Sequence, residues 1–390
     1  MRTYRIILLL FLAFLHKGIS TADAKTKEVR PDWISHKIPL EDTRRHRLFK
    51  KNPEKCLLQV IEIPYSSPLP QRGTVLMIPG LMQNALALDL APEVNTSYAR
   101  YVMQNYGLQP FLLNTRGNGQ SCLPKNSNLD DIAIEDVSIA VNFVSEMAGN
   151  KIFVMGHSQG GLVLQAYMAG MARCEGTQTC FQKNVAEERQ SHLLGAVILG
   201  ANVGMTGNPK GKLRRNSMLA EFLLGRPFSI IVDEIPMKLL TRLISPSKKR
   251  LLGVVSGSNS FAYNPFWHSI YQIPNVSLEM RQKFYDSTLD TTSLGVLLQY
   301  ARGIRQLGMS TRTGDRYADA LPNIHVPVAM GVFEYDPFAT PEATLTETFN
   351  KLGSPQKHYV MFNEEGHEDF LLNSNLFAKH NLLWNYLLLQ

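Results

Sequence analysis

The feature that most constrains the fold is the sequence Gly-His-Ser-Gln-Gly at 156–160, which joins an apolar, strand-like run at 151–155 to a helix-like run at 161–168. A sharp turn between a strand and a helix strains the backbone of its central residue and leaves no room for bulky side chains two positions away. Glycines at both of those positions meet this requirement. The sequence therefore predicts that the Ser158 hydroxyl stands clear of a sheet. The next amide should open a helix, where negative charge is stabilised.

Apolar runs alternate with helical patterns along most of the chain, which is typical of a mostly parallel sheet flanked by helices. We expect strands at 57–63, 74–78, 110–114, 152–155, 196–199, 326–332 and 358–362. The spacing of apolar residues predicts a helix at 131–147, with Gly149 as its stop. A second helix, with a threonine cap and a first-turn proline, is expected over 340–353, and a last one over 376–388.

The alternation breaks between 204 and 321, where the chain has helix-like pieces, many large apolar side chains and no clear series of strands. We interpret this stretch as a helical cap inserted into the sheet core, with an apolar face that would line a binding pocket. Part of the stretch must also serve as additional helical core. The expected organisation is a leader at 1–24, a core at 25–203 and 322–390, and the cap at 204–321.

The chain begins with a basic segment, an apolar run at 6–15 and an Ala-Asp-Ala sequence that ends at Ala24. This pattern predicts a secretory signal peptide cleaved after Ala24. An uncleaved anchor is the alternative, although the apolar run is short for a membrane span. No later segment is long and apolar enough to cross a membrane, so we expect an exported protein in an extracellular, periplasmic or organelle-lumen compartment. If the source is eukaryotic, Asn95 and Asn275 fit the N-glycosylation pattern.

The chain has four cysteines, Cys56, Cys122, Cys174 and Cys180, and an even number in an exported chain permits disulfides. Cys174 and Cys180 flank a short polar loop that a local bridge could close, which leaves Cys56 and Cys122 as a second pair. None has metal-ligand spacing, so no metal and no other cofactor is expected. The formal net charge of +7 comes from scattered basic residues without a nucleic-acid-binding motif, so a nucleic-acid partner is not expected.

A serine hydroxyl is a poor nucleophile until a base takes its proton, and the base needs an acid to orient it. In chains with this kind of turn the order is serine, acid, histidine. His367 fits this order because it lies in a loop just beyond the last predicted strand, at the same sheet edge as Ser158. The side chain of His157 should point away from the hydroxyl. Three other histidines fall elsewhere in the expected fold: His325, His358 and His380.

The acid should follow the strand at 326–332. Asp336 begins the loop after this strand and precedes a proline, so it can reach across to His367. Glu334 is the alternative, since it would share the same face if the strand continued by two residues. Asp336 is the predicted acid, and geometry alone leaves Glu334 open.

Negative charge on the reacting oxygen has to be stabilised by two backbone amides. One should come from Gln159, directly after the serine. The other should come from the loop after the strand at 74–78, where Gly80 allows a tight turn and Pro79 has no amide hydrogen. Leu81 is the expected second donor.

Several stretches of the chain resemble the acid lipase family of α/β-hydrolases, the group that includes lysosomal and gastric lipases. They are Pro-Gly-Leu at 79–81, Phe-Leu-Leu-Asn-Thr-Arg-Gly-Asn at 111–118, Gly-His-Ser-Gln-Gly at 156–160, Asp-Pro-Phe-Ala-Thr-Pro at 336–341 and His-Glu-Asp-Phe at 367–370. The resemblance implies an α/β-hydrolase fold with a helical cap and a triad of Ser158, Asp336 and His367. It also implies oxyanion amides at Leu81 and Gln159.

Two further features concern the loops that hold these catalytic and oxyanion residues in place. Pro79 stands where the family usually has histidine, which leaves the Leu81 amide intact but alters its surroundings. We interpret Arg116 and Asn118 as structural residues that brace the loop beside the turn.

The leading hypothesis is a secreted serine ester hydrolase that cleaves carboxylic esters through an acyl-enzyme on Ser158. An acyltransferase would use the same triad with an alcohol in place of water. A third hypothesis is a hydrolase-fold protein that binds without catalysis, and its mark would be a missing triad residue. The expected partner is a small-molecule ester or lipid, with a lipid interface as a transient contact.

Overall fold

The computed structural model describes residues 30–40, 56–124, 126–175, 178–205, 234–236 and 270–390. The expected leader at 1–24 lies outside this part of the chain, as do residues 206–233 and 237–269 of the expected cap. None of the helices in the described part is long and apolar enough to span a membrane. Leader cleavage and export stay predictions.

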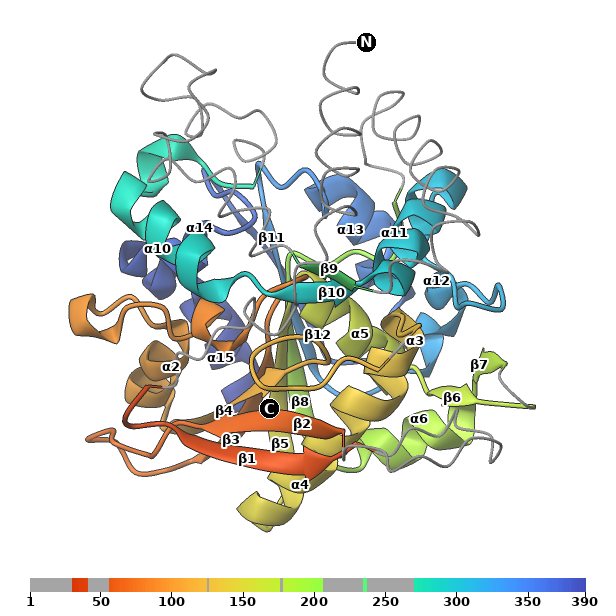
Figure 1. Ribbon diagram of the computed structural model, residues 1–390, viewed down its shortest axis with the longest axis horizontal. Helices are drawn as coiled ribbons and strands as arrows, with labels where there is room; N and C mark the ends of the chain where they lie inside the picture. The colour runs from red at the N-terminus through yellow and green to blue at the C-terminus, as the bar shows by residue number, and fades with distance from the viewer. Residues whose placement is uncertain (1–29, 41–55, 125, 176–177, 206–233, 237–269) are drawn as a thin grey trace, which may run out of the picture.

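An eight-stranded sheet forms the centre of the molecule (Figure 1). In spatial order its strands are β1 (Ile34–Pro39), β2 (Leu57–Glu62), β4 (Leu108–Asn114), β3 (Gly73–Ile78), β5 (Ile152–His157), β8 (Leu193–Leu199), β11 (Val328–Phe333) and β12 (Lys357–Phe362). The pairs β1–β2 and β2–β4 are antiparallel, and all other neighbours run parallel. The predicted mostly parallel sheet is confirmed, and each predicted strand overlaps an observed one.

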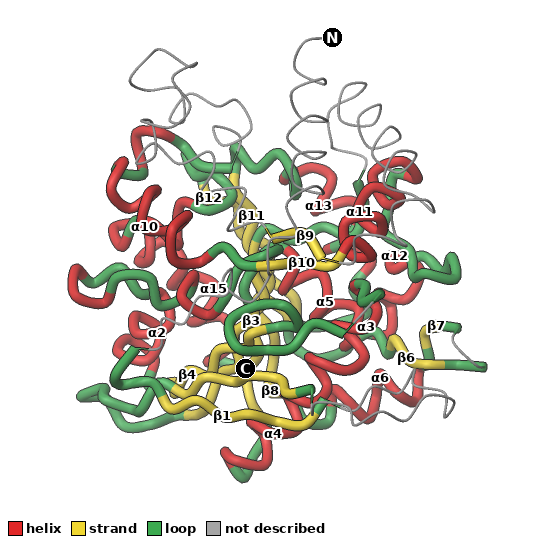
Figure 2. Tube along the Cα trace, in the orientation of Figure 1, coloured by secondary structure: helices red, strands yellow, loops and turns green. Residues whose placement is uncertain are grey.

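The central strands are buried on both faces, which is why they read as continuous apolar runs. In β3, Val75 and Met77 belong to one layer of core, and Leu76 and Ile78 belong to the other, as the two-residue period of a strand requires. Figure 2 shows helices on both sides of the strands. The helices packed on the two layers are α2 (Tyr98–Tyr106) and α15 (Asn381–Leu388) on the first, and α4 (Ser138–Ala148) and α5 (Gln159–Met168) on the second.

The edge strand β1 was absent from the sequence-based prediction. Its sequence, Ile-Ser-His-Lys-Ile-Pro, mixes apolar and polar residues, and its side chains are exposed or only half-buried. Because one edge and much of each face contact solvent, the strand does not need the apolar run that marks a central strand.

The three predicted helices are present, but each is divided into more than one element. The first consists of α3 (Leu129–Asp131), a π-helical turn at Ile132–Val137 and α4. The second consists of α13 (Pro341–Glu347) and a 3₁₀ turn at Phe349–Lys351. The third consists of a 3₁₀ segment at Ser374–His380 and α15. Gly149 ends α4 as predicted, in the left-handed region with φ of 62°. Thr340 begins the second helix without the side-chain cap expected of it.

The described part of 204–321 is mostly helical and contacts the loop after β3. Its elements are β9 (Glu234–Pro236), α10 (Leu278–Thr288), β10 (Thr291–Ser293), α11 (Leu294–Gln306) and α12 (Tyr317–Ala320). The short antiparallel ribbon of β9 and β10 was not predicted. The Asn84 amide donates to the Thr288 carbonyl (2.9 Å), and the Asp290 amide donates to the Met82 carbonyl (2.8 Å). The domain boundaries at 203 and 321 stay predictions.

Both cysteine pairs that the sequence allowed are joined in the structure. Cys174–Cys180 closes the hairpin of β6 (Met171–Arg173) and β7 (Thr179–Phe181). Cys56–Cys122 joins the start of β2 to the loop after β4. Each bridge restricts the unfolded chain, and the second closes a loop about ten times longer in sequence, 66 residues against 6.

Trp384 is a test of how far α15 supports the sheet. Its side chain is fully buried, and its Nε1 donates to the Tyr98 hydroxyl of α2 (3.0 Å). Trp384→Ala should lower the free energy of unfolding by about 3–5 kcal/mol, because it removes a buried indole and leaves a cavity. The measurement is urea unfolding. Leu389→Ala, at a side chain that is 83% exposed, is the control and should change stability by less than about 0.5 kcal/mol. Equal effects of the two variants would contradict this packing role.

Candidate active site

Ser158 occupies a strained turn between β5 and α5. Its φ of 53° and ψ of −120° lie where few residues other than glycine are found. A Cβ on Gly160 would lie 2.1 Å from the Ile78 carbonyl oxygen, and a Cβ on Gly156 would lie 2.5 Å from the Gly161 nitrogen. The close backbone contacts on both sides of the serine explain why glycine stands at both positions.

The structure brings Ser158, His367 and Asp336 together from three loops at one edge of the sheet. The Ser158 Oγ lies 2.8 Å from Nε2 of His367, and Nδ1 of His367 lies 2.6 Å from Oδ2 of Asp336. Both the imidazole and the carboxylate are buried, at 3% and 2% exposure. This arrangement requires the tautomer in which Nδ1–H donates to Asp336 and Nε2 accepts from the serine hydroxyl.

Asp336 is itself held by the loop after β11. Its Oδ1 accepts from the amides of Phe338 (2.7 Å) and Ala339 (2.9 Å), so that Oδ2 is left for the imidazole. Burial is the largest single influence and would lower the pKa of His367, but the adjacent Asp336 carboxylate, together with smaller contributions from Glu368 and Asp369, outweighs it. The pKa of His367 is therefore raised above its ordinary value. The site stabilises an imidazolium, which is the species formed when the histidine takes the serine proton.

The other candidates have different partners. Glu334, the alternative acid, is exposed, and its Oε2 accepts from the Glu364 amide (2.8 Å). His157 has its Nε2 on the His367 carbonyl oxygen (3.0 Å), and the histidine that contacts the Ser158 hydroxyl is His367. The three other histidines that were expected away from Ser158 lie elsewhere in the described fold. His325 lies beside the Gly353 carbonyl, His358 is stacked on Tyr386, and His380 packs against Phe362.

The two expected oxyanion donors lie in neighbouring segments. The missing side chain of Gly160 lets the start of α5 approach the carbonyls of Ile78 and Pro79, so the Leu81 loop runs beside the helix end that carries the Gln159 amide. Among the described residues, neither the Leu81 amide nor the Gln159 amide donates a hydrogen bond. Both amides are available to a bound group, and their role as oxyanion donors stays a prediction.

The loop that carries His367 is held by buried acids that the sequence analysis did not single out. Glu365 lies 3.3 Å from Lys379 Nζ and 3.5 Å from His380 Nε2. Asp369 accepts from the amides of Gly366 and Gln272, at 2.9 Å each. The signal was present in the sequence, because three acids within two residues of one histidine are unusual for a buried loop.

Glu368 and Gln83 form a second support that the sequence did not indicate. Gln83 Nε2 donates to Glu368 Oε1 (2.8 Å), and Gln83 Oε1 accepts from the Gly80 amide (3.0 Å). Both side chains are buried, at 5% and 3% exposure. Burial raises the pKa of Glu368 to about 7, against the opposing effects of His367 and the Gln83 hydrogen bond.

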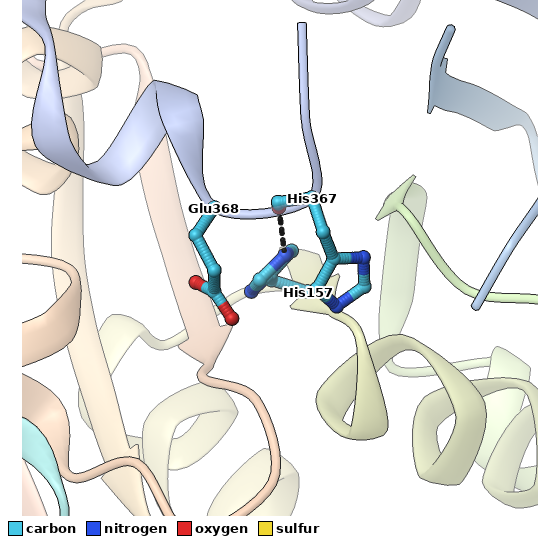
Figure 3. A group of neighbouring side chains, drawn as sticks. All are labelled: His157, His367 and Glu368. Atoms are coloured by element: carbon cyan, nitrogen blue, oxygen red, sulfur yellow. Dashed lines mark hydrogen bonds between the residues drawn. The ribbon is translucent and has the colours of Figure 1, made fainter. Parts of the chain in front are cut away.

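Figure 3 shows a cluster of possible metal ligands, His157, His367 and Glu368, whose ligand atoms lie within 4.8 Å of one another. Both ring nitrogens of His367 already have partners, Ser158 and Asp336. An ion would find at most two of the three residues unengaged, whereas structural and catalytic zinc sites use three or four protein ligands. These residues therefore fit a hydrogen-bonded site better than a metal site.

The predicted structural role of Arg116 agrees with its contacts. The guanidinium is buried and donates to Asp136 and to Glu135 (2.8 Å), and its backbone amide also donates to Asp136 (2.8 Å). Asn118 donates to Thr115 within the same loop (2.9 Å). These bonds tie the loop after β4 to the π-helical turn that packs against α5.

The two glycosylation sequences differ in the structure. Asn95 is exposed at a left-handed turn, with φ of 59°. The side-chain nitrogen of Asn275 donates to Asp369 (2.7 Å) and to the Glu364 carbonyl (2.6 Å). A glycan on that nitrogen would disturb contacts that hold the His367 loop, so Asn95 is the better acceptor of the two.

Solved structures with a similar fold are α/β-hydrolases. An esterase from Thermogutta terrifontis matches with a TM-score of 0.52 at 13% identity, over 91% of this chain and 99% of that chain. A monoacylglycerol lipase from Paleococcus ferrophilus gives 0.51 at 15% identity, over 85% and 99%. The α/β-hydrolase GrgF from Penicillium gives 0.52 at 17% identity, over 91% and 97%. At these identities the likeness concerns the fold, and the predicted α/β-hydrolase fold is confirmed.

No protein-family model matches the sequence, and no curated protein matches it significantly. The comparisons therefore do not support membership of the acid lipase family in particular, and that resemblance stays a prediction.

Gly160→Ala tests the close contact at the turn. The added Cβ would meet the Ile78 carbonyl at 2.1 Å, so β3 and α5 must separate. We expect a loss of about 2–3 kcal/mol in the free energy of unfolding and slower labelling of Ser158 by a serine-reactive phosphonate. Gly73→Ala is the matched control, because its Cβ would meet side chains rather than backbone, those of Leu108 at 3.4 Å and Phe153 at 3.8 Å. A Gly160→Ala variant with wild-type stability and labelling would show that the turn tolerates a side chain.

Proposed function

We propose that this protein is a serine hydrolase of carboxylic esters, exported from the cell or into an organelle. The observation that carries the proposal is the hydrogen-bonded series from Ser158 Oγ through His367 to Asp336 at a strained turn, with distances of 2.8 and 2.6 Å. A buried imidazole between a hydroxyl and a carboxylate is the arrangement that activates serine for attack on a carbonyl.

In the proposed reaction, the Ser158 Oγ attacks the ester carbonyl carbon while His367 Nε2 takes the hydroxyl proton. The amides of Gln159 and Leu81 would donate to the oxygen that becomes negative. Asp336 stabilises the imidazolium through Nδ1. When the carbonyl re-forms, the C–O bond to the alcohol breaks, and His367 returns its proton to the departing alcohol oxygen. A water molecule then attacks the acyl-enzyme by the same route and releases the acid.

A lipid or other small-molecule ester is the substrate class that we favour. The resemblance to acid lipases supports a lipid ester. Among the structural neighbours are the monoacylglycerol lipase noted above and a bacterial membrane phospholipase A, which matches with a TM-score of 0.51 at 12% identity over 99% of both chains. A lipid interface would then be a transient contact of the enzyme. About half of the cap that would select the acyl chain lies outside the described residues.

Ser158→Ala tests the nucleophile. Turnover of a p-nitrophenyl ester should fall by about six orders of magnitude, because no hydroxyl remains to form the acyl-enzyme, while the thermal unfolding temperature stays close to that of the wild type.

A panel of esters from acetate to palmitate, with and without an emulsified interface, gives the preferred acyl length. Ester formation with an added alcohol would instead favour an acyltransferase. Retained turnover in Ser158→Ala would rule out the mechanism. A wild-type protein that neither hydrolyses any of the esters nor is labelled at Ser158 by a serine-reactive phosphonate would favour a binding protein.

Asp336→Asn tests the acid. The amide cannot hold His367 in the required tautomer or stabilise the imidazolium, so turnover should fall by about four orders of magnitude. Glu334→Gln is the matched control and should retain turnover within about twofold, since its carboxylate is exposed and accepts from a backbone amide that a glutamine oxygen can also bond. The measurement is kcat/KM for the same ester. A larger loss in Glu334→Gln would reassign the acid.

A further inference from the structure

The loop of the proposed oxyanion donors is connected to the loop of His367 by buried side chains. At one end, the Gly80 amide donates to Gln83 Oε1 (3.0 Å), and Gln83 Nε2 donates to Glu368 Oε1 (2.8 Å). Gly80 directly precedes Leu81, and Glu368 directly follows His367. The Gln83 amide group therefore fixes the distance between the two loops.

At the other end, His157 contacts the backbone of the catalytic loop. Its Nε2 lies 3.0 Å from the His367 carbonyl oxygen. Because a carbonyl can only accept, Nε2 must carry the hydrogen. Burial, together with the neighbouring His367, holds the pKa of His157 well below its ordinary value, so the ring is neutral. A neutral ring with its hydrogen on Nε2 has a lone pair on Nδ1, which can only accept.

Between these ends lie two buried atoms whose hydrogen-bonding needs are not met by any described residue: Nδ1 of His157 and Oε2 of Glu368. Figure 3 shows the His157 ring between the Glu368 carboxyl group and the His367 backbone, with its second nitrogen turned toward the carboxyl group. If Glu368 were ionised, two acceptors would face each other in a buried site, which is costly. One proton on Oε2 turns this pair into a donor and an acceptor.

We propose that Glu368 is a positioning residue that works as a neutral carboxylic acid, with Oε1 accepting from Gln83 and Oε2–H directed at Nδ1 of His157. The side chains of Gln83, Glu368 and His157 then hold the Leu81 loop and the His367 loop in a fixed position relative to each other. This inference rests on the proposed function, because the two loops matter for rate only if Leu81 and His367 act in catalysis.

The electrostatic surroundings agree with this protonation state. The pKa of Glu368 is raised to about 7, mainly by burial and further by Asp336 and Asp369, against the opposing effects of His367 and the Gln83 hydrogen bond. The neutral His157 adds no charge. Ionisation of Glu368 would both break the link to His157 and add negative charge that raises the pKa of His367. Both effects leave less of the active form, in which Glu368 is neutral and His367 is unprotonated.

Glu368→Gln is the decisive variant, because glutamine keeps the acceptor for Gln83, offers a donor to His157 and cannot ionise. His367 loses its proton in both proteins as the pH rises, so the informative quantity is the ratio of wild-type to Glu368→Gln kcat/KM for a p-nitrophenyl ester. This ratio should fall roughly tenfold between about pH 6 and pH 9, as Glu368 of the wild type loses its proton. Glu364→Gln removes an exposed charge from the same loop and should follow the wild-type profile. A ratio that stays constant across this pH range would overturn the proposal.

Coupling between Glu368 and Gln83 tests the link itself. Glu368→Ala and Gln83→Leu should each lower kcat roughly tenfold with little change in KM, and the double variant should lose no more than either single variant, because each change breaks the same series. Losses that multiply would show independent roles and would contradict the proposal.

Stability gives a readout that does not depend on activity. A buried carboxyl group whose pKa is raised carries no penalty below the pKa of the unfolded chain, near 4.5, and its penalty grows as the pH rises through about 7. The unfolding temperature of Glu368→Gln should therefore rise relative to that of the wild type across this range. A difference that stays constant with pH would overturn the neutral carboxyl. Absence of wild-type turnover and labelling, with this stability change present, would count against the proposed function alone.

Discussion

The contact between Gly160 and the carbonyl of Ile78 is the constraint on which the rest of the site depends. It can form only because position 160 lacks a side chain, and it lets the first turn of α5 lie directly against the end of β3. That approach forces Ser158 into its strained conformation and brings the Leu81 loop beside the Gln159 amide. The strain is retained because the fully buried strand β5 and a helix buried along its whole length leave the turn no alternative.

Around this turn, the geometry is maintained by buried polar groups rather than by apolar packing alone. The His367 loop is anchored by Glu365, Glu368 and Asp369, each bonded to a different part of the molecule. The loop after β4 is anchored by Arg116 in the same way. Buried networks of this kind stabilise one arrangement strongly when every group has a partner and are costly when one lacks it. Two buried acceptors without a donor between them, such as Nδ1 of His157 and Oε2 of Glu368, therefore indicate that one of the two carries a proton.

The strands and the three residues of the candidate triad could be predicted from the sequence because their signals are local. A strand buried on both faces must be apolar throughout, and the serine and the acid each follow such a strand. The histidine follows the edge strand β12, and the three residues come in a fixed order along the chain. The edge strand β1 could not be predicted because solvent removes that requirement. The link from Gln83 to Glu368 joins residues 285 positions apart. Nothing in either local sequence indicates the other, so only the folded structure could place them together.

The pairing of Asn84 and Met82 with the segment at 288–290 has a consequence for how substrate size would affect the enzyme. The loop of the proposed oxyanion donors shares its backbone hydrogen bonds with the chain that leaves α10. A substrate that displaces α10 to gain entry would therefore also displace the loop whose Leu81 amide is proposed to stabilise the transition state. A molecule too bulky for the site would be bound and yet react slowly, so selectivity among substrates would be expressed in kcat more than in KM.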